Sequence, residues 1–273
     1  FIVLLEEWYL SADSVYGVPL QVYSPGLYVE GKLQKAIQME IEGALNRVNF
    51  REQSYSDIQF QALYSQKTLL GEIRVTDSLL QSQLQVELAH DSVFSLAVHG
   101  GIDIIADSVT ERYQNLALST LLDFSYRQNG DSSFTASGAM TNVKADIEGT
   151  AYLIDTFRLA VNEENNKTTI ACNSDFVNSN ISFDAPVNDV ISWFRDGLGY
   201  KTKHDTTGLV DFVSSLPVFT LETHFIMHPL LEKMILKEKF VFGELGLKVI
   251  SEPGAEKKAV LDIRNAASED VEI

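Results

Sequence analysis

The chain has 273 residues, which is enough for one large domain or two smaller ones with a sizeable core. Its net charge of −17 at pH 7 argues against binding to nucleic acid and against docking flat on an anionic membrane, because both need clusters of Lys and Arg. The one cysteine, Cys172, excludes an internal disulfide framework and a cysteine-based zinc site.

The start of the chain carries no convincing targeting signal. The opening Phe-Ile-Val-Leu-Leu is shorter than the roughly 20 residues of a membrane-spanning helix, and no basic region precedes it. The chain also begins without methionine and within a strand-like pattern. We therefore expect it to be an excised or processed piece of a longer protein.

Apolar and polar residues alternate along much of the chain, which is typical of β-strands with one apolar face and one wet face. The alternation appears in pieces between Leu27 and Val48 and is clearest from Asp57 to Ile105, where Leu63 is an exception on the polar side. Short strands joined by polar turns, such as the turn expected at Ser65–Thr68, indicate an antiparallel meander. The predicted inward residues of this stretch are Ile58, Phe60, Ile73, Val75, Leu84, Val86, Leu88, Phe94, Leu96 and Val98.

The same pattern continues beyond this stretch. Residues 107–115 fit either a short helix or a long turn, and Asn129-Gly130 predicts a hairpin turn. A further polar turn is expected at Asn162–Lys167, and Cys172 then falls on the apolar side of its strand. The predicted inward residues continue with Leu122, Phe124, Tyr126, Phe134, Phe157, Leu159, Ile170 and Phe183.

After Pro186 the apolar spacing changes to three and four residues, which predicts helices. Strand spacing returns at Phe219, and Pro229–Ile235 fits a third short helix. The apolar residues of the first two predicted helices are Val190, Ile191, Phe194, Leu198, Phe212 and Val213.

These patterns predict a mainly β fold in which a long curved antiparallel meander sheet forms an open groove. We expect the groove at residues 1–186 and a helical insertion that packs on it at 187–218. Further strands with a short helix are expected at 219–262, and a flexible acidic tail at 263–273.

No catalytic constellation emerges from the sequence. A Gly-rich phosphate loop, a nucleophile elbow and a metalloprotease helix motif are all absent. His224 and His228 are four residues apart, but positions four apart on a strand lie about 13 Å from each other. We therefore predict no metal, no cofactor and no enzymatic activity.

The apolar face has two interpretations. In most antiparallel proteins such a face packs against a second sheet or a helix. Plausible helices are confined to residues after Pro186, however, so a single long sheet is short of partners. Such a sheet can curl on itself around either a filled core or a lined groove.

Two pairs of stretches share a sequence pattern of strand, turn and strand. They are Asp57–Tyr64 with Leu70–Asp77, and Leu153–Asn162 with Thr169–Val177. In this pattern the chain resembles the TamB branch of the AsmA-like proteins, in the form found in Bacteroides-type bacteria, over most of Leu27–Ile250. The resemblance implies a periplasm-spanning protein of a Gram-negative bacterium, anchored in the inner membrane, with an open apolar groove that moves phospholipid toward the outer membrane. It also implies a TamA-type outer-membrane barrel as a partner of other regions.

The resulting expectation is an internal segment that binds or conducts phospholipid acyl chains along a groove lined by the inward residues. The apolar helices would lie over this groove or close one end of it, either as a gate that admits lipid or in a packing role only. The alternative is a structural or adhesive β-sandwich or solenoid with a packed core that acts through protein contacts.

Overall fold

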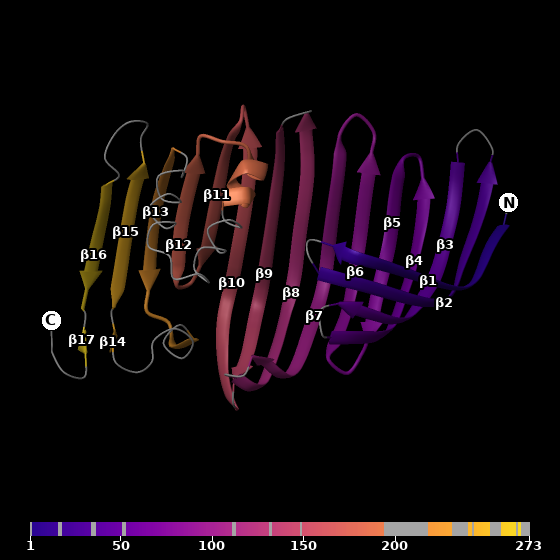
Figure 1. Cartoon of the computed structure of the whole chain (residues 1–273), viewed down its shortest axis with the longest axis horizontal. Coiled ribbons are helices and arrows are strands. Elements are labelled where there is room, and N and C mark those ends of the chain that lie inside the picture. The colour runs from indigo at the N-terminus through magenta and orange to yellow at the C-terminus, as the bar shows by residue number, and fades with distance from the viewer. Residues whose placement is uncertain are drawn as a thin grey trace. The chain divides into compact units, whose positions relative to one another are not determined.

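The computed structural model describes residues 2–15, 18–33, 37–50, 53–110, 113–130, 133–147, 149–193, 218–230, 240–241, 243–251, 258–265 and 267–268. Within these residues fifteen strands form one antiparallel sheet in chain order, with β1 (Ile2–Val15) and β16 (Lys258–Arg264) at its edges (Figure 1). This order confirms the predicted meander. The chain has two compact units, the first formed by residues 1–127 and 139–154 and the second by residues 128–138 and 155–273.

The first ten described strands have 9 to 18 residues each, and the later ones have 2 to 8. The first nine are β1 (Ile2–Val15), β2 (Val18–Leu33), β3 (Ile37–Phe50), β4 (Gln53–Ser65), β5 (Thr68–Thr76), β6 (Leu80–His90), β7 (Phe94–Thr110), β8 (Tyr113–Gly130) and β9 (Ser133–Ile147). The others are β10 (Thr150–Glu164), β11 (Lys167–Ser174), β12 (Val177–Phe183), β13 (Phe219–Ile226), β14 (Phe240–Val241), β15 (Glu244–Ser251), β16 (Lys258–Arg264) and β17 (Ala267–Ser268).

Two of the predicted polar turns are tight two-residue hairpins. Gln66 and Lys67 connect β4 to β5, and Asn165 and Asn166 connect β10 to β11, all four with positive φ between 51° and 66°. Two consecutive positive φ values are the geometry of a type I′ turn, whose twist matches that of the strands it joins. The sequence located both turns because their residues are polar and flanked by alternating segments.

Two turn predictions need correction. Residues 107–115, expected to form a short helix or a long turn, belong to β7 and β8 as far as they are described, and Ser108 pairs with Gln114. Asn129-Gly130 does not form the hairpin turn, because both residues are the last of β8. The reason is the same in both places: cross-strand pairing extends the strands beyond the point where the apolar alternation stops.

Strand β9 contains a local shift of its two faces. From Phe134 to Gly138 the even-numbered residues are the more buried ones, and after Asn142 the odd-numbered residues Val143, Ala145 and Ile147 are buried. Asn142 has a positive φ of 53°. One residue in this conformation reverses the alternation, as in a β-bulge. A strict period of two cannot predict such a reversal.

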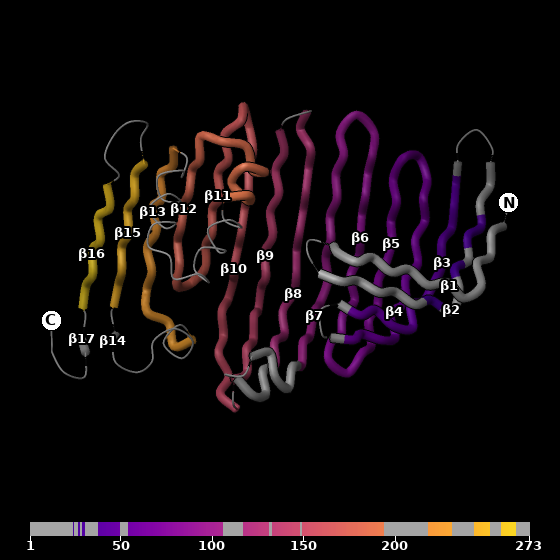
Figure 2. The backbone as a smooth tube through the Cα atoms, in the orientation of Figure 1, coloured from indigo at the N-terminus to yellow at the C-terminus, as the bar shows by residue number. Residues whose placement is uncertain are grey.

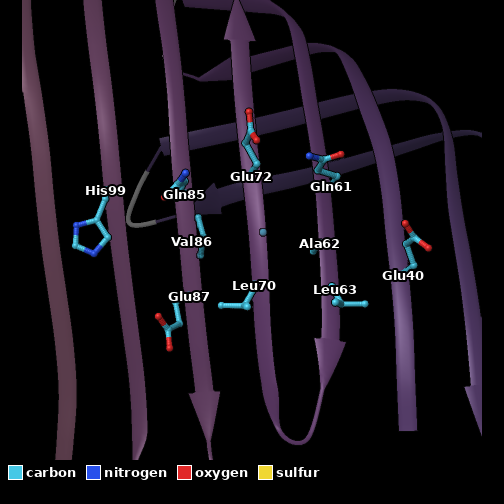
Figure 3. A pocket seen from close by; sticks show the side chains of 11 residues that line it. Glu40, Gln61, Ala62, Leu63, Leu70, Glu72, Gln85, Val86, Glu87 and His99 are labelled. Atoms are coloured by element: carbon cyan, nitrogen blue, oxygen red, sulfur yellow. The ribbon is translucent and has the colours of Figure 1, made fainter.

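The sheet of the first unit curls. In Figure 1 the β3–β4 pair bends so that its hairpin end crosses the following strands, and Figure 2 shows the same bend in the backbone trace. Figure 3, seen from the opposite side, shows these strands passing behind the sheet. The pair remains in register through the bend, and Phe60 lies so close to Gly43 that an added Cβ would be 2.3 Å from the ring. The first unit therefore has the predicted curvature.

The described helical residues belong to the second unit. Residues 187–193 form a helix directly after β12, and residues 229 and 230 are helical after β13. The rest of the predicted helical insertion, including Phe194, Leu198, Phe212 and Val213, lies outside the described residues, as does the rest of the predicted third helix. The region predicted as a tail begins within β16, and Val241 pairs with Ala267 between β14 and β17.

Candidate functional site

The apolar residues predicted from 58 to 126 lie on one face of the first unit. Directly opposite residues of antiparallel strands point to the same side of a sheet. Phe60 pairs with Ile73, and Ile73 pairs with Leu84. The residues that the register places on this face are Ile58, Phe60, Ile73, Val75, Leu84, Val86, Leu88, Phe94, Leu96, Val98, Leu122, Phe124 and Tyr126. We call this surface the apolar face of the first unit.

Three cross-strand rows form the centre of this face, running across β4 to β8. The first row contains Phe60, Ile73, Leu84, Gly100 and Leu122. The second contains Ala62, Gly71, Val86, Val98 and Phe124. The third contains Tyr64, Leu69, Leu88, Leu96 and Tyr126. Neighbouring rows are two residues apart along each strand, so the outer rows lie roughly 14 Å from each other.

The side chains of this face are half-buried rather than buried. Among the predicted lining residues of the first unit only Val75 is buried, with 7% exposure, and the others are intermediate. Phe94 and Tyr126 contact each other edge to face, with ring centroids 5.9 Å apart. A packed sandwich core would bury such large side chains almost completely. The face is thus lined without being filled.

A buried carboxylate borders the apolar face where β5 ends. Asp77 is 6% exposed and accepts hydrogen bonds from the Ser56 amide (2.8 Å), the Ser56 hydroxyl (2.8 Å) and the Leu79 amide (2.7 Å). Burial acts to raise the pKa of Asp77, but the hydrogen bonds from Leu79 and Ser56 together hold it below the ordinary value of 3.8. The carboxylate ties β4 to the β5–β6 turn and thereby fixes one margin of the face.

The second unit has an apolar face of its own. Register places Leu159 opposite Cys172, Ile170 opposite Ile181, and Phe183 opposite Phe219. The predicted lining residues on this face are Phe157, Leu159, Ile170 and Phe183. Leu159 remains 43% exposed, whereas Phe183 is only 5% exposed.

Phe134 joins the same face of the second unit. The hydroxyl of Thr135 donates to the Asn162 side chain (3.1 Å), which places Thr135 on the polar side of the sheet together with Asn162. Its neighbour Phe134 therefore points to the opposite, apolar side. Phe134 is half-buried there.

The helix at residues 187–193 covers part of the apolar face of the second unit. Val190 is 1% exposed and forms a buried cluster with Phe183 and Ala185. The half-buried residues packed against this cluster are Ile170, Ile181, Trp193 and Phe219. The prediction that Val190 packs on the sheet is therefore consistent with the structure.

One predicted covering residue points elsewhere. Ile191 is 57% exposed, and Trp193, which the sequence analysis did not select, makes the contact instead. The helix presents positions 190 and 193, three residues apart, to the sheet, and Ile191 lies more than 100° away around the axis. The i, i+3 spacing of Val190 and Trp193 was the signal that could have identified the correct stripe.

Polar contacts anchor the start of this helix to the sheet. The Val187 amide donates to the carboxylate of Glu163 (2.9 Å), and Glu163 is only 8% exposed. The hydroxyl of Thr168, fully buried, donates to the Ala185 carbonyl (2.7 Å). A carboxylate that accepts from an amide in the first turn satisfies a donor that the helix itself leaves unpaired. The helix therefore has a defined position on β10 to β12.

The two histidines singled out by their spacing make unrelated contacts. His224 lies 3.6 Å from Glu244, whereas His228 stacks on Phe176 with ring centroids 5.3 Å apart. Within the described ranges no group of three or more His, Cys, Asp or Glu side chains is arranged to hold a metal. No helix in that part of the chain has the length and hydropathy to cross a membrane.

Comparison with known proteins gives no relative. No protein-family model, no curated protein and no solved structure matches this chain.

Proposed function

We propose that this chain binds phospholipid acyl chains against the apolar faces of its sheet and lets them pass along the cross-strand rows. Following its resemblance to the TamB branch, we place this activity in the periplasm, in a segment of an inner-membrane-anchored protein. Contact with a TamA-type barrel would then involve other regions of the whole protein.

One observation carries the proposal: thirteen predicted lining residues of the first unit share one face, and all but Val75 are only half-buried. Exposure of such a face to water costs a free energy of about 25 cal/mol per Å² of apolar surface. A ligand without polar groups along its length removes this cost, and an acyl chain is such a ligand.

The row geometry matches an elongated apolar ligand. Each row crosses β4 to β8, five strands about 4.8 Å apart, and so extends for roughly 19 Å. The middle row contains the small residues Ala62 and Gly71, whereas the rows on either side have larger side chains at β4 and β5. The small residues form a shallow channel along this part of the row. An acyl chain that lies along a row contacts side chains from every strand and needs no hydrogen-bonding partner.

The alternative, a structural domain that acts through protein contacts, differs in what meets the apolar face. It requires another protein surface of matching shape over the same residues. The helix at 187–193 shows that protein can cover such a face in this chain, since Val190 is buried against it. Lipid and protein occupants can be separated by a crosslinking experiment.

The experiment places a photoreactive benzophenone residue at Val86 or at Gln85 in the full chain. Val86 lies in the middle row of the apolar face, and the neighbouring Gln85 lies on the opposite, exposed face. Each variant is irradiated after expression in a Gram-negative host, and the products are analysed by mass spectrometry. We expect phospholipid adducts at position 86 and few or none at position 85.

The pattern of adducts decides between the occupants. Protein adducts at position 86 without lipid would favour the structural alternative. Equal lipid labelling at both positions would refute binding to the apolar face, because it would show contact without preference for a side.

A further inference from the structure

The polar face of the first unit carries an apolar spot that lipid binding to the opposite face does not use. Leu63 and Leu70 are cross-strand partners on β4 and β5, with 51% and 52% of their surfaces exposed. Leu63 alternates with lining residues of its strand, so it points away from the apolar face. A leucine pair on a face that is otherwise largely polar interrupts the alternation at the same place on two strands.

Carboxylates flank this pair on both sides. One cross-strand row on the polar face reads Glu40, Leu63, Leu70 and Glu87. Figure 3 shows the two leucines on neighbouring strands, with the two glutamates on the strands to either side. Glu40 and Glu87 belong to strands three positions apart in the sheet, so they are separated by roughly 14 Å.

The surface around the row is hollowed and acidic. A shallow depression of about 730 Å³ is lined by Glu40, Gln61, Ala62, Leu63, Leu70, Gly71, Glu72, Gln85, Val86, Glu87 and His99. The nearby cation Arg74 is engaged by Glu72 at 3.1 Å, and Glu72 also accepts from the Gln83 side chain at 2.8 Å. His99 lies 3.3 Å from Asp123. Among the described residues that line the depression there is no lysine or arginine, and both carboxylates at the ends of the leucine row are exposed.

We propose that this row is a docking surface for another protein, which presents an extended segment with apolar residues between two basic ones. Contact between the leucine pair and the partner removes the apolar side chains of both from water, and each glutamate attracts a Lys or Arg of the partner. In an extended chain the roughly 14 Å between the glutamates corresponds to basic residues four positions apart, which point to the same side of the segment together with the residue midway between them. This surface is on the opposite side of the sheet from the lipid-binding face, so its occupancy does not depend on the proposed function.

The test measures binding of a fluorescent peptide to the full chain by anisotropy. The probe has the sequence Lys-Ala-Leu-Ala-Lys, in which both lysines and the central leucine point to one side of an extended chain, and the comparison peptide replaces both lysines with glutamate. We expect binding of the basic peptide that weakens with salt, because the flanking charges are exposed. Binding of the acidic peptide with equal affinity would overturn the proposal, as would failure of the basic peptide to bind.

Variants locate the binding on the protein. Leu63→Ser with Leu70→Ser should abolish binding, whereas Leu121→Ser, at a residue 52% exposed elsewhere on the same face, should leave it unchanged. Glu40→Gln and Glu87→Gln should each weaken binding by up to about fivefold, as expected for exposed charge pairs. Unchanged affinity in the leucine double variant would refute the assignment. Dimerisation of the chain that the same variant abolishes would show that a second copy occupies the surface, which would also overturn the proposal.

Discussion

The contact between the helix at 187–193 and the sheet of the second unit can be tested by a matched pair of truncations. Val190→Ala removes two methyl groups that are fully buried, which costs about 1.6 kcal/mol in transfer free energy. The cavity that remains raises the loss to about 2–3 kcal/mol. Ile191→Ala removes three carbons from a side chain that is 57% exposed, so its loss is at most about 1 kcal/mol. Both changes to alanine raise helix propensity by similar amounts, and this contribution cancels in the comparison.

Trp193 provides the assay because it packs against the same cluster as Val190. The other tryptophan, Trp8, is replaced by phenylalanine, so that fluorescence reports on Trp193 alone. We expect the Trp193 emission of the Val190→Ala variant to shift toward that of exposed indole at a lower urea concentration than in the Ile191→Ala variant. The far-UV circular dichroism of the strands should change little below that concentration, because local undocking of a helix can precede global unfolding.

Two outcomes would refute this reasoning. If both truncations moved the Trp193 transition equally, Val190 would not hold the helix on the sheet. If the fluorescence and circular dichroism of the Val190→Ala variant changed together at every urea concentration, the helix would not undock as a separate unit, and a gate built on this movement would be ruled out.

Three further predictions concern the sheet itself. Gly100→Ala should destabilise the chain by roughly 3 kcal/mol or more, because an added Cβ would lie 1.9 Å from a β6 carbonyl oxygen at a φ of 154°. Gly101→Ala, where the nearest atom to an added Cβ is 3.9 Å away, should leave the free energy of unfolding in urea nearly unchanged. The lowered pKa of Asp77 implies a stabilising contribution that is present above pH 3.8 and is lost as the pH falls through the folded-state pKa, so Asp77→Asn should show a flatter dependence of stability on pH in this acidic range. Glu163→Ala should cost about 1–3 kcal/mol by leaving the Val187 amide without its acceptor, and Glu163→Gln, which keeps an acceptor oxygen, should cost less in thermal unfolding.

The strand arrangement of this chain was predictable because its main signal is local. Within each strand from Ile58 to Val98 every second residue is shielded to some degree from water on one face, and a one-residue change of register would expose all of them. The type I′ turns at Gln66-Lys67 and Asn165-Asn166 also followed from polar residues between alternating runs. The lining residues could therefore be identified without knowledge of how strands pair at a distance.

The predictions that failed depend on backbone angles and on contacts between residues far apart in the sequence, which a short stretch of sequence does not reveal. The bulge at Asn142 reverses the faces of β9 through one backbone angle, and nothing in the alternation before it announces the reversal. Ile191 was selected because it is apolar at a helical spacing from neighbouring residues, but two apolar stripes overlap in that helix. Only the position of the sheet beneath decides that Val190 and Trp193 make the contact. Glu163 lies within the polar turn expected at Asn162–Lys167, but it belongs to β10 and is buried, because its carboxylate accepts a hydrogen bond from the start of the helix.

The two faces of the first unit have different energetic consequences. On the apolar face the proposed ligand contacts are distributed over three rows, so truncation of one side chain leaves most of the apolar contact area in place. A charge introduced at Val86 would instead have to lose its water when an acyl chain lies along the middle row. Because this loss is costly, one such substitution would block passage of the acyl chain along the row. On the polar face the proposed contact is concentrated in Leu63, Leu70 and the two flanking glutamates, so loss of the leucines removes it entirely. Tolerance of truncation on one face and sensitivity to it on the other is what distinguishes a conducting surface from a docking surface.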